Sequence, residues 1–212
     1  MLPKLEEREM TFKPLLQHFK EMKHYFIVVV LVFGVSFYLG WANSDQFSHF
    51  LKDQLEGIKT ISQSLSKKDN PQIWFFFIIF LNNAIKSVAI IFLGLPLGVL
   101  PLFMLVANGM ILGYVLSLQT HESTLAIVLK GILPHGIIEI PVILLACAYG
   151  LKIGMLVWKS AAQIFIPAAN RTAIPELKKV LTLTKPLSVV IVVLLLLAAI
   201  IESTLTYWLV HL

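Results

Sequence analysis

Three long stretches of this 212-residue chain are almost free of charge, and they restrict the fold more than any other feature. Residues 25–42 carry no charged side chain, residues 74–120 carry only Lys86, and residues 186–210 carry only Glu202. A helix of about 20 such residues crosses the roughly 30 Å hydrocarbon core of a bilayer. The chain is 58% hydrophobic and 14% charged, against about 45–50% and about 25% in soluble domains. We therefore predict an all-α, polytopic membrane helix bundle.

Five membrane-spanning helices are predicted. The long block at 74–120 exceeds one crossing, and the turn-forming sequence LGLPLG at 93–98 divides it into two spans joined by a tight turn. Residues 118–130 are expected to form a short loop. The basic stretch 159–185, with Pro167 and Pro175, is expected to form a broken connection. The expected spans, which make a single membrane domain over 25–212, are 25–41, 74–93, 97–117, 132–158 and 186–210.

Two polar segments show helical spacing of apolar residues outside the spans. Residues 1–24 hold five cations and are interpreted as a cytoplasmic amphipathic segment lying on the bilayer before an uncleaved first span. Residues 44–66 are interpreted as an external amphipathic helix. A cleaved signal peptide is the alternative for the first span, but its apolar stretch exceeds a typical signal sequence.

The distribution of lysine and arginine predicts the orientation. The N-terminal segment has five cations and the connection 151–185 has six, whereas the four cations of 43–73 are offset by four acids. Cytoplasmic loops carry the excess of cations, so the N-terminus is expected inside and the C-terminus outside. Lys178, Lys179 and Lys185 are expected to meet anionic lipid headgroups. The net charge of +5 follows from this pattern, and nucleic-acid binding is not expected.

Several polar side chains lie within the predicted spans. Counted from the external boundary at 1.5 Å per residue, Asn82, Asn108, Glu139 and Glu202 lie at a depth of roughly 10–14 Å, and His135 lies one turn shallower than Glu139. A charge at such depth costs at least about 2.5–3.5 kcal/mol. We therefore expect a cluster that faces the bundle interior around a polar cavity open to the outside. Its expected members are Asn82, Asn83, Asn108, His135, Glu139 and Glu202, with Lys86 one turn deeper than Asn82 and neutralising one acid.

Two interpretations of this cluster are left open. Asparagine and histidine side chains can simply bond neighbouring helices to each other. His135 and Glu139, four residues apart on one helix face, could instead ligate a divalent metal such as zinc, with Glu202 as a third ligand. Pro134 and Gly136 are expected to loosen the start of this span beside the site.

Small residues predict close helix contacts. Gly94 and Gly98, Gly109 and Gly113, and Gly150 and Gly154 each lie four residues apart, the spacing that lets helix backbones approach. The single cysteine, Cys147, lies in an apolar run and is interpreted as a packing residue.

Three ordered segments resemble a known family. FLNNAIKS at 80–87, VANGMILG at 106–113 and ILPHGIIEIPVILLACAYGLKIG at 132–154 are similar, in that order, to the signature segments of the stage II sporulation protein M family. The resemblance implies an integral membrane protein acting in engulfment of the forespore. It also implies two bitopic partners that degrade septal peptidoglycan, so this chain would be their scaffold or localiser and not itself the enzyme. Glu202 lies outside the matched segments.

Two other functions remain as alternatives. One is a metal-binding membrane protein or a metal-dependent intramembrane hydrolase centred on His135 and Glu139. The other is a small-solute or ion transporter that uses the buried acids as a proton relay, although no inverted repeat is evident. A homo-oligomer is compatible with each of these functions.

Overall fold

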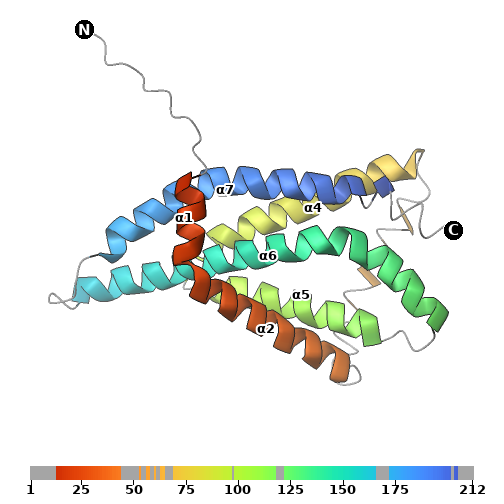
Figure 1. Cartoon of the computed structure of the whole chain (residues 1–212), viewed down its shortest axis with the longest axis horizontal. Helices are drawn as coiled ribbons and strands as arrows, with labels where there is room; N and C mark the ends of the chain where they lie inside the picture. The colour runs from red at the N-terminus through yellow and green to blue at the C-terminus, as the bar shows by residue number, and fades with distance from the viewer. Residues whose placement is uncertain are drawn as a thin grey trace, which may run out of the picture.

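The computed structural model describes most of the chain as one helical bundle (Figure 1). Of residues 13–16, 122–135 and 164–165 it describes the backbone alone. The described residues are 13–43, 53, 56, 57, 60, 63, 64, 69–96, 98–117, 122–165, 172–201, 203 and 204. They contain helices and turns and no strand.

Five helices are long and apolar enough to cross a membrane, which confirms the predicted fold class. Helices α2, α4, α5 and α7 supply one crossing each, and residues Gly136–Gln163 of α6 supply the fifth. Their bounds are α2 Lys23–Ala42, α4 Pro71–Phe92, α5 Val99–Ser117, α6 Glu122–Phe165 and α7 Ala173–Ile201. The chain is therefore a multi-pass membrane protein.

The turn between α4 and α5 lies where the sequence placed it. Turn residues follow α4 at 93–96, and Gly98 takes the left-handed conformation with φ +74° directly before α5. A residue with a Cβ rarely adopts this conformation, so glycine is favoured there. At the other end of α4, Pro71 stands at the first helical position. A backbone N–H at this position has no partner within the helix, so proline, which lacks the N–H, costs no hydrogen bond there.

Helix α6 differs from the prediction because it begins earlier. It runs from Glu122 through Phe165 over 44 residues, so 122–130 is helical rather than a loop, and Pro134 does not mark a helix start. Proline is tolerated inside a membrane helix when neighbouring groups or a local bend satisfy the carbonyl that it frees. Figure 1 shows α6 bending in its N-terminal part, and proline is the usual cause of such a bend.

Helix α7 also begins earlier than predicted. It starts at Ala173, so Pro186 lies inside the helix rather than at its beginning, and Pro175 does not break the connection. Pro175 falls in the first helical turn, where the backbone N–H groups have no partner within the helix, so its ring does no harm there. The C-terminal part of α6 and the N-terminal part of α7 lie side by side and extend beyond α1 in Figure 1.

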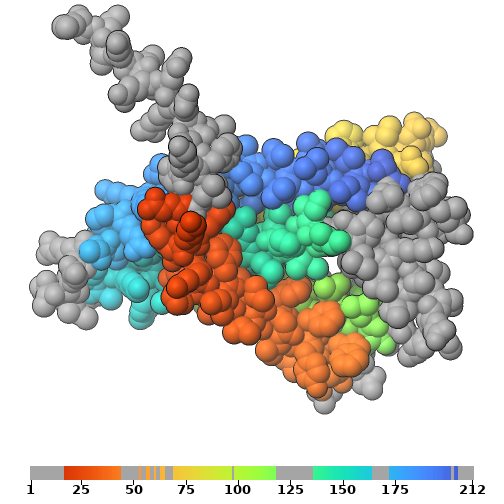
Figure 2. All heavy atoms as spheres, in the orientation of Figure 1, coloured from red at the N-terminus to blue at the C-terminus, as the bar shows by residue number. Residues whose placement is uncertain are grey.

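The short helix α1, Lys13–Glu21, packs across α6 and α7. Figure 2 shows it lying over both helices, and Phe19 meets Tyr149 of α6 edge to face at 6.2 Å between ring centroids. In the described part of the N-terminal segment, Phe19 therefore packs on protein, where a bilayer surface was expected. The predicted helix 44–66 falls largely outside the described residues.

The core centres on α6. Its residues Ala146 to Tyr149 are fully or almost fully buried, and Leu187, Ile191 and Leu195 of α7 are buried in the same apolar cluster. Cys147 is buried, and its Sγ donates to the carbonyl of Pro101 at 3.5 Å. This placement agrees with its interpretation as a packing residue.

Candidate functional site

A polar contact joins two spanning helices in the middle of the chain. Asn83 of α4 donates a hydrogen bond from Nδ2 to Oε1 of Glu139 on α6, across 56 residues of sequence. Both side chains are partly buried. The acid therefore lies against a neutral amide donor, which stabilises a carboxylate oxygen in an apolar setting.

Asn82 extends this contact toward the outside of the bundle. Its Nδ2 donates to Oδ1 of Asn83 at 3.4 Å, and its side chain is exposed. The three residues form a chain of amide and carboxylate groups that runs from the surface of α4 to α6. We call Asn82, Asn83 and Glu139 the α4–α6 polar chain.

Lys86 lies one turn along α4 from Asn82 and is also exposed. The sequence suggested that it neutralises an acid, but within the described part of the chain it has no ion pair. It therefore presents its charge on the outer surface of α4. The carboxylate of Glu139 is met by an amide, not by this cation.

The other predicted members are not brought into the α4–α6 polar chain by the described contacts. Asn108 of α5 donates from Nδ2 to the carbonyl of Met104 in its own helix at 2.7 Å. His135 lies on α6, but its side chain is outside the described residues, as is Glu202. Two of the three side chains of the candidate metal set, which is His135, Glu139 and Glu202, therefore lie outside the described residues. Among the described side chains, no three metal-ligating groups come together.

A second polar cluster, which the sequence analysis did not single out, holds α1 against α6 and α7. His18 is 1% exposed and lies edge to face with Tyr149 at 5.5 Å between centroids. Its Nδ1 lies 3.4 Å from Oε2 of Glu21, which in turn lies 3.4 Å from Nζ of Lys179. We call His18 and Glu21 with their partners on α6 and α7 the α1 clamp.

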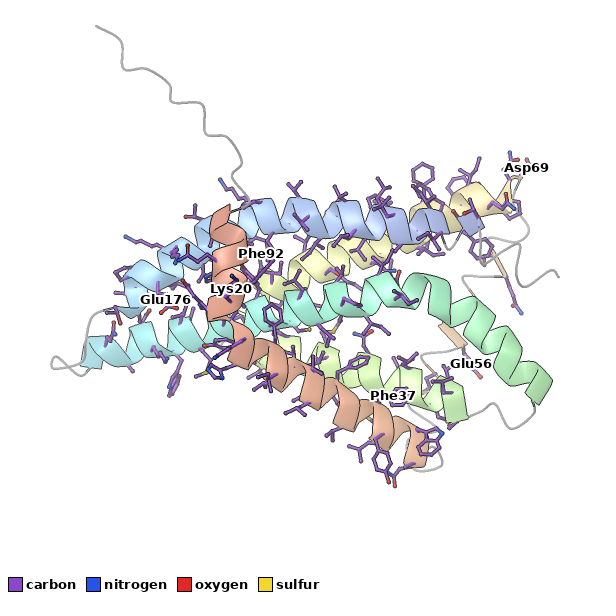
Figure 3. The ribbon with its side chains drawn as sticks, viewed as in Figure 1. Lys20, Phe37, Glu56, Asp69, Phe92 and Glu176 are labelled. Carbon is purple, nitrogen blue, oxygen red and sulfur yellow. The ribbon has the colours of Figure 1, made fainter. Side chains whose placement is uncertain are left out.

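A buried cation lies beside the α1 clamp. Lys152 of α6 is 3% exposed, and its Nζ pairs with Oε1 of Glu176 on α7 at 3.0 Å. Figure 3 labels Glu176 on α7 and Lys20 on α1, at the same end of the bundle. The sequence already indicated that Lys152 needs a charged partner, because it is the only charged residue in the apolar stretch between Glu139 and Lys159.

The surroundings of the α1 clamp change how its groups bind protons. Burial lowers the pKa of His18 below its usual value, and the nearby charge of Lys152 lowers it further, while Glu21 partly opposes both. The pKa of Glu21 is lowered by its hydrogen bond to His18 and by Lys179. Neutral His18 and ionised Glu21 are therefore the favoured forms when α1 is packed.

Comparison with known proteins places the chain in a family. The family described as Stage II sporulation protein M matches residues 26–207, which is most of the chain. The chain belongs to the stage II sporulation protein M family. The match includes α4, α5, α6 and α7, all of α2 after its first three residues, and the α4–α6 polar chain. Neither a curated protein nor a solved structure gives a match.

Membership in the stage II sporulation protein M family confirms the resemblance carried by the three sequence segments. Two of those segments, 80–87 and 132–154, lie on α4 and α6 and supply Asn83 and Glu139. The third, 106–113, supplies glycines that pack against α2. The segments thus contribute helix-to-helix contacts in the interior of a sporulation membrane protein.

Proposed function

We propose that this chain scaffolds or localises peptidoglycan-degrading partner proteins during engulfment of the forespore. The observation that carries the proposal is the family match over residues 26–207. Two bitopic partners are part of what the family resemblance implies, and the cell-wall chemistry would belong to them. In this function the chain binds other membrane proteins and holds them in place.

The arrangement of polar groups supports a binding role. Asn83 and Glu139 bond α4 to α6, while Asn82 and Lys86 are displayed on the outside of α4. Groups that bond helices together stabilise a bundle, and exposed polar groups in a span offer contacts to a neighbouring span. Both arrangements suit a protein whose task is to assemble others.

The proposal includes an orientation with the N-terminus and the α6–α7 connection in the cytoplasm. It is supported by the eleven cations of residues 1–24 and 151–185 and by the contact of Glu21 with Lys179, which joins these two segments. Segment 44–66 would then face the partners outside. Cysteine labelling of Glu56→Cys in a Cys147→Ala background should occur from outside the cell; labelling only after permeabilisation would contradict this orientation.

Deletion of the gene in its own host tests the function. In sporulating cells, a fluorescent fusion of each septal peptidoglycan hydrolase should lose its septal position, and membrane staining should show engulfment arrested at a flat septum. Expression of the intact chain should restore both. Hydrolases that remain at the septum while engulfment proceeds would overturn the proposal.

A further inference from the structure

Two polar side chains form a stripe on the outer surface of α4. Asn82 and Lys86 lie four residues apart, so they occupy one face of the helix, and both are exposed. Within the described part of the chain, Asn82 bonds only its neighbour Asn83, at 3.4 Å, and Lys86 has no hydrogen bond or ion pair. We call these two residues the α4 polar stripe.

The α4 polar stripe lies deep within the spanning helix. Asn82 is near the centre of Pro71–Phe92, and Lys86 is six residues before Phe92, the nearer helix end. At 1.5 Å per residue these positions lie about 15 Å and about 9 Å from that end. Side chains on a helix tilt toward its N-terminus, so Lys86 points away from Phe92 and is poorly placed to reach the closer membrane surface. The stripe thus exposes a cation and an amide to hydrocarbon.

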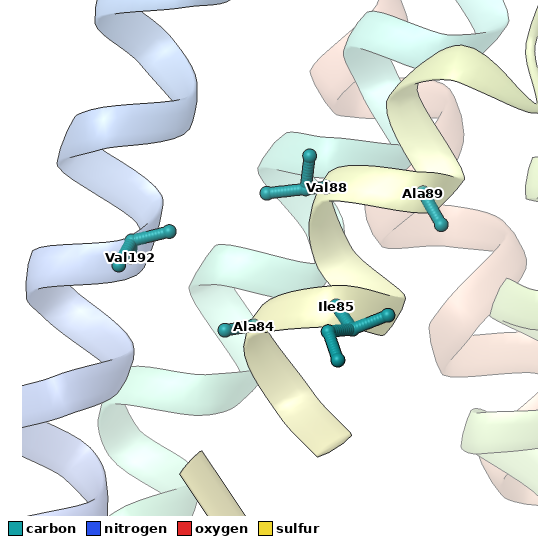
Figure 4. A pocket seen from close by; sticks show the side chains of 5 residues that line it. All are labelled: Ala84, Ile85, Val88, Ala89 and Val192. Atoms are coloured by element: carbon teal, nitrogen blue, oxygen red, sulfur yellow. The ribbon is translucent and has the colours of Figure 1, made fainter. Parts of the chain in front are cut away.

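An apolar groove adjoins the stripe. It has a volume of about 440 Å³ and lies between α4 and α7, lined by Ala84, Ile85, Val88, Ala89 and Val192. Figure 4 shows Ala84 and Val88 on the side of α4 toward Val192, with Ile85 and Ala89 further around the helix. Ala89 is three residues after Lys86 and so shares its face. A small residue such as Ala89, which is only partly buried, lets another helix approach closely.

Charge decides which occupant fits this surface. In a two-fold symmetric dimer through α4, the same patch meets itself, so Lys86 would lie near the Lys86 of a second copy. Like charges in a low-dielectric medium repel strongly, which disfavours a second copy. A helix with a carboxylate would satisfy both the cation and the amide.

We propose that the α4 polar stripe and its adjoining groove dock a transmembrane helix of a partner protein, and that this helix carries an Asp or Glu level with Lys86. The carboxylate pairs with Lys86 Nζ and accepts from the Asn82 amide, while an apolar face fills the groove beside Ala89. This inference rests on the proposed function, because it names the surface through which the scaffold holds a partner.

Model peptides test the surface without any native partner. Two 22-residue Leu/Ala transmembrane peptides, one with a central Glu and one with Gln, are mixed with the labelled full-length protein in vesicles of a zwitterionic lipid. Energy transfer should show the Glu peptide binding about three- to tenfold more tightly than the Gln peptide. Lys86→Gln should abolish this difference. Lys185→Gln, which removes an exposed cation from α7, should leave it intact.

Charge reversal gives the decisive comparison. Lys86→Glu should bind a Lys-bearing peptide and lose its preference for the Glu peptide. Equal binding of the Glu and Gln peptides, or an unchanged preference in Lys86→Gln, would overturn the proposal. Self-association of the chain that Lys86→Gln weakens would also overturn it, in favour of a second copy. Because no hydrolase is present, these outcomes do not depend on engulfment, and failure of the gene-deletion test would leave them standing.

Discussion

At the scale of single residues, the contact between Asn83 and Glu139 can be interpreted as a structural bond between two helices or as part of a metal site. A carboxylate inside a spanning segment needs a hydrogen-bond donor, and Nδ2 of Asn83 supplies one to Oε1. In a structural role the pair bonds α4 to α6. In a metal site the carboxylate charge itself would be essential. Substitutions that keep the shape of Glu139 but remove its charge separate these roles.

Glu139→Gln should change the free energy of unfolding very little, because the glutamine amide oxygen still accepts the hydrogen bond from Asn83. Glu139→Leu should lower the free energy of unfolding by about 1–3 kcal/mol, since the Asn83 amide is then left without its partner. Denaturant titration of the protein in detergent measures both variants. The double variant Asn83→Leu with Glu139→Leu should recover part of the loss, because no orphaned amide remains.

The metal interpretation gives a different pattern. Elemental analysis of the purified protein would then show a stoichiometric divalent metal that both Glu139→Gln and His135→Ala remove. Finding this metal, or finding equal destabilisation by Glu139→Gln and Glu139→Leu, would contradict a purely structural role for the contact.

The sequence could predict that Glu139 meets an asparagine of α4, but not which one. Adjacent residues on a helix point about 100° apart, so the choice between Asn82 and Asn83 depends on how α4 is rotated about its axis. Apolar residues surround both positions, and their pattern does not fix that rotation. The structure turns Asn83 toward α6 and leaves Asn82 on the surface beside Lys86.

At the scale of helices, the sequence predicted which segments cross the membrane better than where those helices end. Uncharged runs mark the hydrocarbon core, but a helix continues into water wherever its residues allow it. Hence α6 begins at Glu122 and α7 at Ala173, well outside the apolar runs. Pro175 and Pro186 misled the prediction, because a proline is harmless in a first turn and tolerated in a packed membrane helix.

The glycine spacing did predict a close contact between two helices. A Cβ on Gly109 would come within 2.9 Å of the Phe33 carbonyl oxygen of α2. A Cβ on Gly113 or on Gly40 would overlap backbone atoms of the facing helix. The backbones of α2 and α5 therefore touch where these glycines stand, as small residues four apart permit.

Gly113→Val should separate α2 from α5 and destabilise the protein by about 1–3 kcal/mol, the usual range for overpacking. Gly34→Val is the matched control, because a Cβ at Gly34 of α2 meets nothing within 4 Å. Thermal unfolding in detergent compares the two variants with the parent chain. Equal loss of stability in both would show that valine itself, rather than the helix contact, is responsible.

At the scale of the whole molecule, the α1 clamp fastens the N-terminal segment to the end of the bundle. The clamp holds His18 and Glu21 of α1 and Lys179 of α7, and the ion pair of Lys152 on α6 with Glu176 on α7 lies beside it. Tyr149 of α6 supports the His18 ring from the side. The attachment of α1 should therefore depend on which of these groups carry charge.

Acidification should release α1. Burial and Lys152 lower the pKa of packed His18 below 6.5, so the packed state binds this proton less readily than the released state. The contribution of neutral His18 to the attachment is then fully present above pH 6.5 and is lost as the pH falls below that value. Glu21, whose pKa is lowered from 4.5 by His18 and Lys179, acts in the same direction at lower pH.

Distances between spin labels on α1 and α7 measure this release. Labels at Lys20→Cys and Lys178→Cys, both exposed positions, in a Cys147→Ala background should show a several-fold rise in long distances between about pH 7.5 and about pH 5. His18→Phe keeps an aromatic ring against Tyr149 and removes the titrating group, so its distances should stay constant over this range. Because Glu21 and Lys179 remain in this variant, an unchanged pH response would assign the release to that ion pair and contradict the role given to His18.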